Sequence, residues 1–134
     1  MERVFIDTGG WYAAADSGDR DHGAVARWLR RNTLPLVTTD YVFDETVTLV
    51  RIELGHPAAV QFGERLRAST VVQIVPVTAD DREAAWDIFK KFEDQRFSFT
   101  DCTSFAVMKR LELAKVLTVD RHFLLMGFIP VTRT

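Results

Sequence analysis

The sequence predicts an α/β fold, a three-layer α/β/α sandwich with a central parallel sheet. Short apolar runs alternate along the chain with longer stretches whose apolar residues repeat at helical spacing. The runs are apolar almost throughout, as expected of strands that a parallel sheet buries on both faces. The 134 residues contain no internal repeat and no linker rich in proline or glycine. We therefore expect one domain over residues 1–134.

The first half of the chain is predicted to contain two strands and three helices. The pair Gly9–Gly10 is expected to break the chain after the first strand. Gly55 and Pro57 are expected to end the second and longest of the helices. In order, the elements are a strand at residues 4–6, a helix at 24–32, a strand at 36–38, and helices at 40–54 and 58–68.

The second half is predicted to contain three strands and three helices. Thr78 and Thr100 are each expected to cap the helix that follows. Ala85, Ile88 and Phe92 fall on one apolar face of the first of these helices. In order, the elements are a strand at residues 71–75, helices at 78–92 and 100–113, a strand at 116–119, a short helix at 123–126 and a strand at 128–131.

The composition is that of a globular protein, with 47% hydrophobic and 27% charged residues. No apolar run approaches the ~18 residues that span a bilayer, and the N-terminus lacks the features of a signal peptide. The one cysteine, Cys102, cannot form an internal disulfide, so we expect a core thiol in a cytoplasmic protein without membrane association. The net charge of −2 is not that of a protein that binds nucleic acid by charge alone. Affinity for nucleic acid would therefore need a local basic patch or bound cations.

Two aspartates follow predicted strands. Asp7 comes directly after the run at residues 4–6, and Asp120 comes directly after the run at residues 116–119. In open α/β sheets, ligands bind beyond the carboxyl ends of the strands, so these two carboxylates are expected to converge. The alternative for each is a structural role, in which the aspartate only caps the helix after the strand.

Two further acids lie on predicted helices. Glu45 shares a helix face with Leu49 and Ile52, so it interrupts an apolar surface, whereas its neighbour Asp44 lies on a polar face. Asp101 lies in the first turn of its helix, on a face that also carries apolar residues. The alternative for Glu45 is a side chain that reaches water at the edge of the sheet. The alternative for Asp101 is a first-turn acid that only interacts favourably with the helix dipole. The main apolar face of the Glu45 helix is predicted to consist of Phe43, Val47, Val50 and Leu54.

A cluster of these acids needs a neutralising partner. Burying a carboxylate without one costs several kcal/mol, and neighbouring carboxylates repel each other. No lysine or arginine falls at a strand end where it would pair with all of them. Oxygen ligands without histidine or cysteine suit Mg²⁺ or Mn²⁺, and these cations serve phosphoryl chemistry. The residues predicted to bind the metal and to be catalytic are Asp7, Glu45, Asp101 and Asp120.

Other acidic designs for phosphoryl transfer lack their defining residues. A phospho-acceptor receiver domain would need an acidic pair after the first strand and a lysine at a late strand end. A phosphatase of the haloacid dehalogenase type would need a second aspartate at the position of Gly9. Neither a phosphate-binding loop nor a Gly-x-Ser-x-Gly motif is present. The three histidines, His22, His56 and His122, lack metal-ligand spacing and are expected on the surface.

The order of the four acids resembles that of the PIN-domain nucleases, and more closely that of the VapC toxins of bacterial toxin–antitoxin pairs. The resemblance covers nearly the whole chain and rests on four segments. These are residues 4–13 around Asp7, 38–46 around Glu45, 98–102 around Asp101 and 118–123 around Asp120. Cys102 is a mild departure from the small residue that usually follows the third acid.

The resemblance implies a PIN fold and an Mg²⁺- or Mn²⁺-dependent endoribonuclease that is the toxin of a toxin–antitoxin pair. It further implies RNA as the substrate, an antitoxin protein that blocks the site, and frequent homodimerisation. By the same resemblance, Asp7, Glu45 and Asp101 are the main metal ligands, and Asp120 supports them. Two alternatives remain open: a PIN nuclease that processes RNA or cuts DNA flaps, and a PIN module that binds RNA without cleaving it.

The resemblance also implies a reaction and further candidate residues. Attack by water on the phosphodiester would leave a 5′-phosphate and a 3′-hydroxyl. Thr8 and Thr100 carry hydroxyls next to two of the acids, where they would either orient a ligand or cap a helix. The basic residues that are candidates to hold RNA phosphates are Arg96, Lys109, Arg110 and Arg121.

Overall fold

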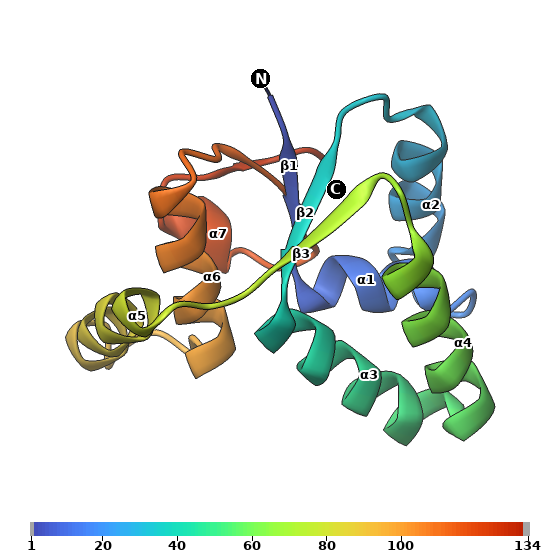
Figure 1. The fold of residues 1–134 in the computed structure, drawn as a ribbon, viewed down its shortest axis with the longest axis horizontal. Coiled ribbons are helices and arrows are strands. Elements are labelled where there is room, and N and C mark those ends of the chain that lie inside the picture. Colours follow the sequence, from blue (N-terminus) through green and yellow to red (C-terminus); the bar gives the residue numbers. More distant parts are fainter. Residues whose placement is uncertain (1, 133–134) are drawn as a thin grey trace.

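The computed structural model describes residues 2–132 and contains a five-stranded sheet with helices on both faces (Figure 1). Neighbouring strands all pair in parallel, in the order β3-β2-β1-β4-β5. The strands are β1 (Val4–Ile6), β2 (Leu36–Thr39), β3 (Val72–Val75), β4 (Lys115–Leu117) and β5 (Ile129–Pro130). The predicted α/β sandwich with a central parallel sheet is therefore confirmed.

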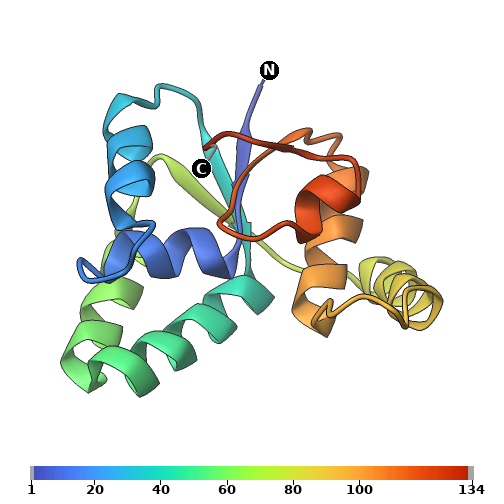
Figure 2. The ribbon, with the colours of Figure 1, turned by 180° about the vertical axis from the view of Figure 1, so that it is seen from behind.

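Seven helices cover the sheet in the part of the chain that the structure describes. They are α1 (Thr8–Ala15), α2 (His22–Arg31), α3 (Asp40–Leu54), α4 (His56–Ala68), α5 (Ala79–Lys91), α6 (Phe99–Arg110) and α7 (His122–Leu125). Helices α1 to α4 lie on one side of the sheet and α5 to α7 on the other (Figures 1 and 2). Helix α5 packs on α6. None of these helices combines the length and hydropathy of a membrane-crossing segment.

The core fills the space between the sheet and its two helical layers. The three residues of β1 are fully buried because this strand lies at the centre of the sheet, between β2 and β4. On one face, the ring of Phe123 packs against Phe5 and Phe105, with centroid distances of 6.4 and 4.9 Å. Cys102 is completely buried in the same layer, as predicted for a core thiol.

Helix α1 occupies the segment where the glycine pair predicted a break, so that prediction was wrong. Both glycines are helical. A Cβ atom on Gly10 would lie 2.4 Å from the carbonyl oxygen of Leu117, the last residue of β4. The absence of a side chain at Gly10 therefore lets α1 approach the end of β4. Trp11 anchors the same helix to β2, because its indole N–H donates a hydrogen bond of 3.1 Å to the hydroxyl of Thr38.

The remaining predicted elements are confirmed, with shifts at some of their ends. Helix α3 has the predicted bounds, and Thr78 caps α5 as predicted. Helix α6, however, begins one residue early, and its cap is Ser98 and not Thr100. The Ser98 hydroxyl accepts the N–H of Asp101, and the Asp101 carboxylate accepts the N–H of Ser98. This reciprocal capping box places the N-cap of the helix at Ser98, two residues before Thr100.

An ion pair joins the outer helix α5 to α6. Arg110 donates hydrogen bonds of 2.9 and 2.8 Å from Nε and one terminal nitrogen to the two carboxylate oxygens of Asp81. The Asp81 side chain is 3% exposed, and that of Arg110 is 39% exposed. Although burial raises the pKa of Asp81, hydrogen bonds from Arg110 and from Thr78 outweigh it and lower that pKa overall. Arg110 thus ties α6 to α5, and its interpretation as a residue that holds RNA remains a prediction.

Replacing Arg110 by methionine is expected to destabilise the fold by about 2 kcal/mol at neutral pH. The loss is smaller than for a fully buried pair because the guanidinium is partly exposed. The lowered pKa of Asp81 means that the pair stabilises the fold above the unfolded pKa of the carboxyl. This contribution is lost as the pH falls through the lower, folded pKa. Urea unfolding at neutral pH and at about pH 3 checks this, with the exposed Lys109→Met as the matched control; an equal loss in both variants would contradict it.

Candidate active site

Acidic side chains gather at the carboxyl end of the sheet. Because the strands are parallel, β1 and β4 end at the same edge, and Asp7 and Asp120 follow them there. Helices α1 and α3 begin at this edge, directly after β1 and β2 (Figure 1). Asp101 lies in the first turn of α6, and its charge raises the pKa of Asp7. The expected convergence of Asp7 and Asp120 is therefore present in the structure, with Asp101 beside them.

Asp7 is the most buried of these acids, with 3% of its surface exposed. Its Oδ1 accepts the N–H of Gly10 at 2.8 Å, which makes Asp7 the N-cap of α1. Its Oδ2 accepts a hydrogen bond of 2.6 Å from the hydroxyl of Thr118, just after β4. The two predicted roles of Asp7 therefore do not exclude each other. Asp7 caps α1, and the same carboxylate also reaches across to the end of the neighbouring strand.

Burial raises the pKa of Asp7 from its ordinary value of 3.8 to about 8. The hydrogen bonds from Thr118 and Gly10 lower it, but the negative charges of Asp120 and Asp101 raise it further. Without a cation, this carboxyl therefore holds its proton at neutral pH. A cation at this position would favour the charged form and displace the proton.

Asp120 and Asp101 meet at His122, which the sequence placed on the surface as an isolated histidine. That prediction was wrong, because the His122 ring is half-buried and its Nδ1 lies 3.1 Å from Oδ2 of Asp101. The same Nδ1 lies 3.8 Å from Oδ1 of Asp120, and the backbone N–H of His122 donates to that oxygen at 2.8 Å. One ligand atom from each of the three residues lies within 4.8 Å of the other two. The spacing of His122 two residues after Asp120 was the available signal in the sequence.

The donor set fits a divalent cation of the Mg²⁺ type. Among the described residues, no lysine or arginine forms an ion pair with Asp7, Asp101 or Asp120. Burial also raises the pKa of Asp120, and the negative charge of Asp101 raises it further, so a cation at the cluster would favour the charged carboxylates. Next to Asp7, the Thr8 hydroxyl oxygen is buried and has no hydrogen-bond partner within residues 2–132. Thr8 therefore does not cap the helix, and its buried oxygen is left for a ligand or a water.

Comparison with known proteins identifies a family for this chain. Residues 4–129 match the PIN domain. The chain belongs to the PIN domain family. Relatives of this PIN domain include the "23S rRNA-specific endonuclease VapC20" of Mycobacterium tuberculosis, which is 37% identical over 128 residues, covering 96% of this chain and 97% of VapC20. "Ribonuclease VapC26" of the same organism is 30% identical over 121 residues, covering 90% of this chain and 89% of VapC26.

Solved structures agree with the PIN fold. The crystal structure of Mycobacterium tuberculosis VapC20, described as a "Sarcin-Ricin loop cleaving toxin", superimposes with a TM-score of 0.92 and 35% sequence identity. That comparison covers 97% of this chain and 99% of the VapC20 chain. FitAcB from Neisseria gonorrhoeae shares the fold at a TM-score of 0.70 with 18% identity, covering 95% of both chains.

Glu45 is the acid that the PIN-domain structure does not tie to the others. It is half-buried on α3 and takes part in no hydrogen bond or ion pair between side chains in residues 2–132. The buried residues of α3 are Val42, Thr46 and Val50, so the buried face is offset from the predicted one. Ile52, expected beside Glu45 on a second apolar face, is 71% exposed, so this part of the prediction was wrong. Asp44 is exposed as predicted, and the role of Glu45 remains a prediction.

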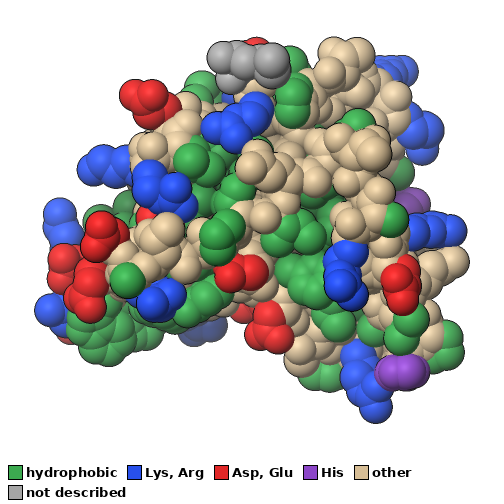
Figure 3. Space-filling model, viewed as in Figure 1, with side chains coloured by type: hydrophobic (Ala, Val, Ile, Leu, Met, Phe, Trp, Pro, Cys, Tyr) green, Lys and Arg blue, Asp and Glu red, His purple; other side chains and the backbone are tan. Residues whose placement is uncertain are grey.

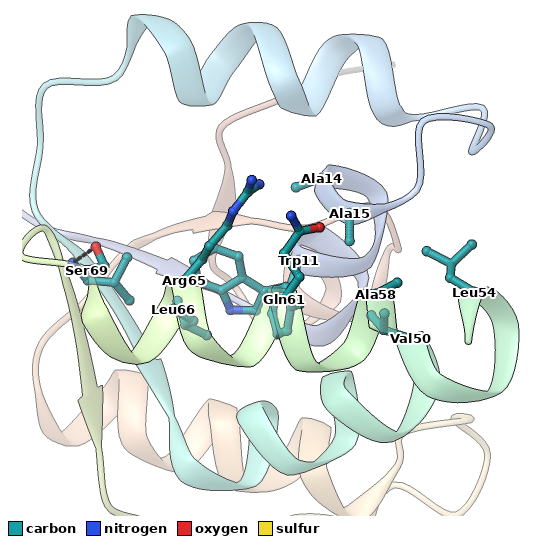
Figure 4. A pocket seen from close by; sticks show the side chains of 12 residues that line it. Trp11, Ala14, Ala15, Val50, Leu54, Ala58, Gln61, Arg65, Leu66 and Ser69 are labelled. Atoms are coloured by element: carbon teal, nitrogen blue, oxygen red, sulfur yellow. Dashed lines mark hydrogen bonds between the residues drawn. The ribbon is translucent and has the colours of Figure 1, made fainter. Parts of the chain in front are cut away.

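The PIN domain has a separate apolar groove of about 340 Å³ between α1, α3 and α4 (Figure 4). Its floor includes Trp11 and Leu66, and the side chains of Gln61 and Arg65 extend from α4 at its mouth. None of the four predicted acids lines it. The groove therefore belongs to a different surface from the carboxylate cluster. Of the basic candidates for RNA binding, Arg96, Lys109 and Arg121 are exposed.

Proposed function

We propose that this PIN domain is a metal-dependent endoribonuclease, that it acts as the toxin of a toxin–antitoxin pair, and that ribosomal RNA is its substrate. The observation that supports this most is the cluster of Asp101, Asp120 and His122 at the carboxyl end of the sheet, with Asp7 close enough for the charges of both aspartates to raise its pKa. The relative with 37% identity along nearly its whole length is named a 23S rRNA-specific endonuclease. The similar VapC20 structure is described as cleaving the sarcin–ricin loop, which is the RNA element we propose for this chain.

Mg²⁺ or Mn²⁺ would be held by Asp7, Asp101 and Asp120, with Glu45 as the proposed fourth ligand. When bound, such a cation lowers the pKa of a water and offsets the charge of the phosphate. The chain prepares the ligands for this task. Thr118 and the N–H of Gly10 fix the Asp7 carboxylate, and the capping box of α6 fixes that of Asp101. These contacts hold the acids in place before the RNA arrives.

The proposed reaction is hydrolysis by water, which gives a 5′-phosphate and a 3′-hydroxyl. A 5′-phosphate on the downstream fragment distinguishes hydrolysis from attack by the 2′-hydroxyl of the RNA, which leaves a 5′-hydroxyl on that fragment. The acids at the site cannot offset the negative charge of the RNA phosphates, because a carboxylate is itself negative. Contacts to the RNA backbone would come from exposed basic residues around the site, such as Arg96 and Arg121.

Cleavage of an RNA hairpin that contains the sarcin–ricin loop tests the function. The purified protein is expected to cut this hairpin at one position in Mg²⁺ or Mn²⁺, and a hairpin with the same stem and another loop should stay intact. Chelation should stop cleavage, and added Mg²⁺ should restore it. Undiminished cleavage in chelator would contradict the metal dependence. Cutting of a DNA flap without cutting of RNA would favour the flap alternative, and binding without any cutting would favour the RNA-binding module.

We also propose an antitoxin protein and a second copy of this chain as partners, as the resemblance to the VapC toxins implies. Two exposed apolar surfaces provide area for them. One is the groove between α1, α3 and α4 (Figure 4). The other is the aromatic cluster of Trp86, Phe89 and Phe99, in which Trp86 and Phe89 are 49% and 41% exposed. Hydrophobic side chains gather over α5, which carries two of these rings, at the lower left of the face in Figure 3.

A further inference from the structure

His122 contacts the carboxylates of two of the clustered acids, Asp120 and Asp101, which lie on separate segments of the described chain. Its backbone N–H binds Oδ1 of Asp120 at 2.8 Å, two residues earlier. Its ring reaches Oδ2 of Asp101 at 3.1 Å, on a helix 21 residues earlier. The two carboxylates repel each other, and Asp101 contributes to the raised pKa of Asp120. His122 therefore connects the first turn of α6 to the loop after β4 at the point where the like charges meet.

The orientation of the His122 ring is fixed by packing. The ring of Phe97 meets it edge to face, with centroids 5.1 Å apart and planes at 76°. Phe97 is only 6% exposed and packs in the same way on Phe105 at 5.1 Å. This row of rings leaves the imidazole little freedom to turn away from Asp101. The contact through Nδ1 is thus built into the core and does not depend on a mobile surface side chain.

The two oxygens of the Asp101 carboxylate have different surroundings. Oδ2 accepts the N–H of Ser98 at 3.0 Å and faces Nδ1 of His122, so both of its lone-pair directions are used. Oδ1 accepts no hydrogen bond from any residue in the range 2–132. The oxygen without a partner is the one available to a cation. In metal sites, partners of this kind orient the ligands, and their removal weakens metal binding.

We infer that His122 is a positioning residue: its Nδ1–H holds the Asp101 carboxylate, at a set distance from Asp120, with Oδ1 free to bind the cation. This inference rests on the proposed metal-dependent function. It requires that Nδ1 carries the hydrogen in the neutral ring, so that Nε2 is bare. It assigns His122 no contact with the RNA and no part in the transfer of protons.

Mg²⁺ binding, measured by calorimetry without RNA, tests the inference. His122→Ala is expected to weaken Mg²⁺ binding roughly 10-fold or more. His122→Asn should restore most of the affinity, because its amide N–H lies at about the same distance from the backbone as Nδ1–H. His122→Gln places its amide nearer the position of Nε2 and should not restore it. His56→Ala, which removes an exposed histidine on α4, should bind Mg²⁺ like the wild type.

Two further measurements separate positioning from packing. In the metal-free wild type at about pH 8, nitrogen NMR should show the hydrogen of His122 on Nδ1; a hydrogen on Nε2 would overturn the inference even if the variants failed to fold. In cleavage assays, the loss in His122→Ala should shrink as Mg²⁺ rises to saturation. Unchanged Mg²⁺ affinity in His122→Ala, or equal losses in the Asn and Gln variants, would also overturn it. A wild type that binds Mg²⁺ in this way but cuts no RNA would contradict the proposed function and leave the inference standing.

Discussion

Asp7→Asn is expected to reduce RNA cleavage roughly 100-fold or more and, at the same time, to stabilise the metal-free protein near pH 8. The wild-type carboxyl is buried, and its pKa is raised to about 8. A raised folded-state pKa means that its contribution to stability is complete below the unfolded pKa and is lost as the pH rises through about 8. Asparagine does not titrate, so the variant avoids this loss. It can also keep both hydrogen bonds, because the Thr118 hydroxyl can accept as well as donate.

Thermal unfolding from about pH 4 to pH 9 checks the stability part of this prediction. The wild type should lose stability across this window relative to Asp7→Asn, with a difference on the order of 1 kcal/mol or more at the alkaline end. Mg²⁺ should raise the melting temperature of the wild type, because it binds the native state, and should raise that of the variant much less. The exposed Asp44→Asn is the control. An equal response to Mg²⁺ in Asp7→Asn and wild type would show that Asp7 is not a ligand.

Glu45→Gln is expected to remove most cleavage, whereas Asp44→Ala should leave it nearly unchanged. Adjacent helical residues point about 100° apart, so one site seldom uses both. Asp44 is exposed, and its loss should cost within ~0.5 kcal/mol of stability. Glu45 is half-buried near the start of α3, the end of this helix that lies at the carboxyl edge of the sheet. Glutamine keeps its shape and removes the charge that a cation would need.

Single-turnover cleavage of one RNA hairpin by both variants, at saturating Mg²⁺, decides between the two residues. A loss of roughly 100-fold in Glu45→Gln alone would support the metal-ligand role. Full activity of Glu45→Gln would remove Glu45 from the site and leave the three acids that the structure brings together. Inactivity of Asp44→Ala alone would mean that the helix presents a different face to the RNA.

The strands and the convergence of Asp7 with Asp120 were predictable because both depend on local order along the chain. Continuous apolar runs identify buried strands, and a parallel sheet brings the residues after those strands to one edge. Asp7 and Asp120 follow this rule directly. The buried face of α3 was less predictable, because apolar side chains lie on both sides of the line from Val42 to Val50. Periodicity alone does not show which of two adjoining faces is buried.

The features that were missed depend on contacts between distant segments. Gly9 and Gly10 have low intrinsic preference for helix, yet both are helical. Asp7 caps this helix, and Gly10 packs against Leu117 at the end of β4, more than 100 positions away. His122 looked isolated because its partner, Asp101, is 21 positions away. Arg110 looked free because its partner, Asp81, is 29 positions away on another helix. None of these pairings leaves a periodic trace in the sequence.

The close approach at Gly10 also limits how this protein can evolve. Every other amino acid would bring a Cβ to about the place that lies 2.4 Å from the Leu117 carbonyl oxygen, and a strand backbone cannot yield to it. Helix α1 would have to move away from β4, and Asp7 would move with it, because the same helix end is capped by its carboxylate. The bond between Asp7 and Thr118 would then lengthen or break. Gly10 is thus constrained by both the fold and the position of Asp7, so selection for a stable fold and selection for a functional site act there as a single pressure.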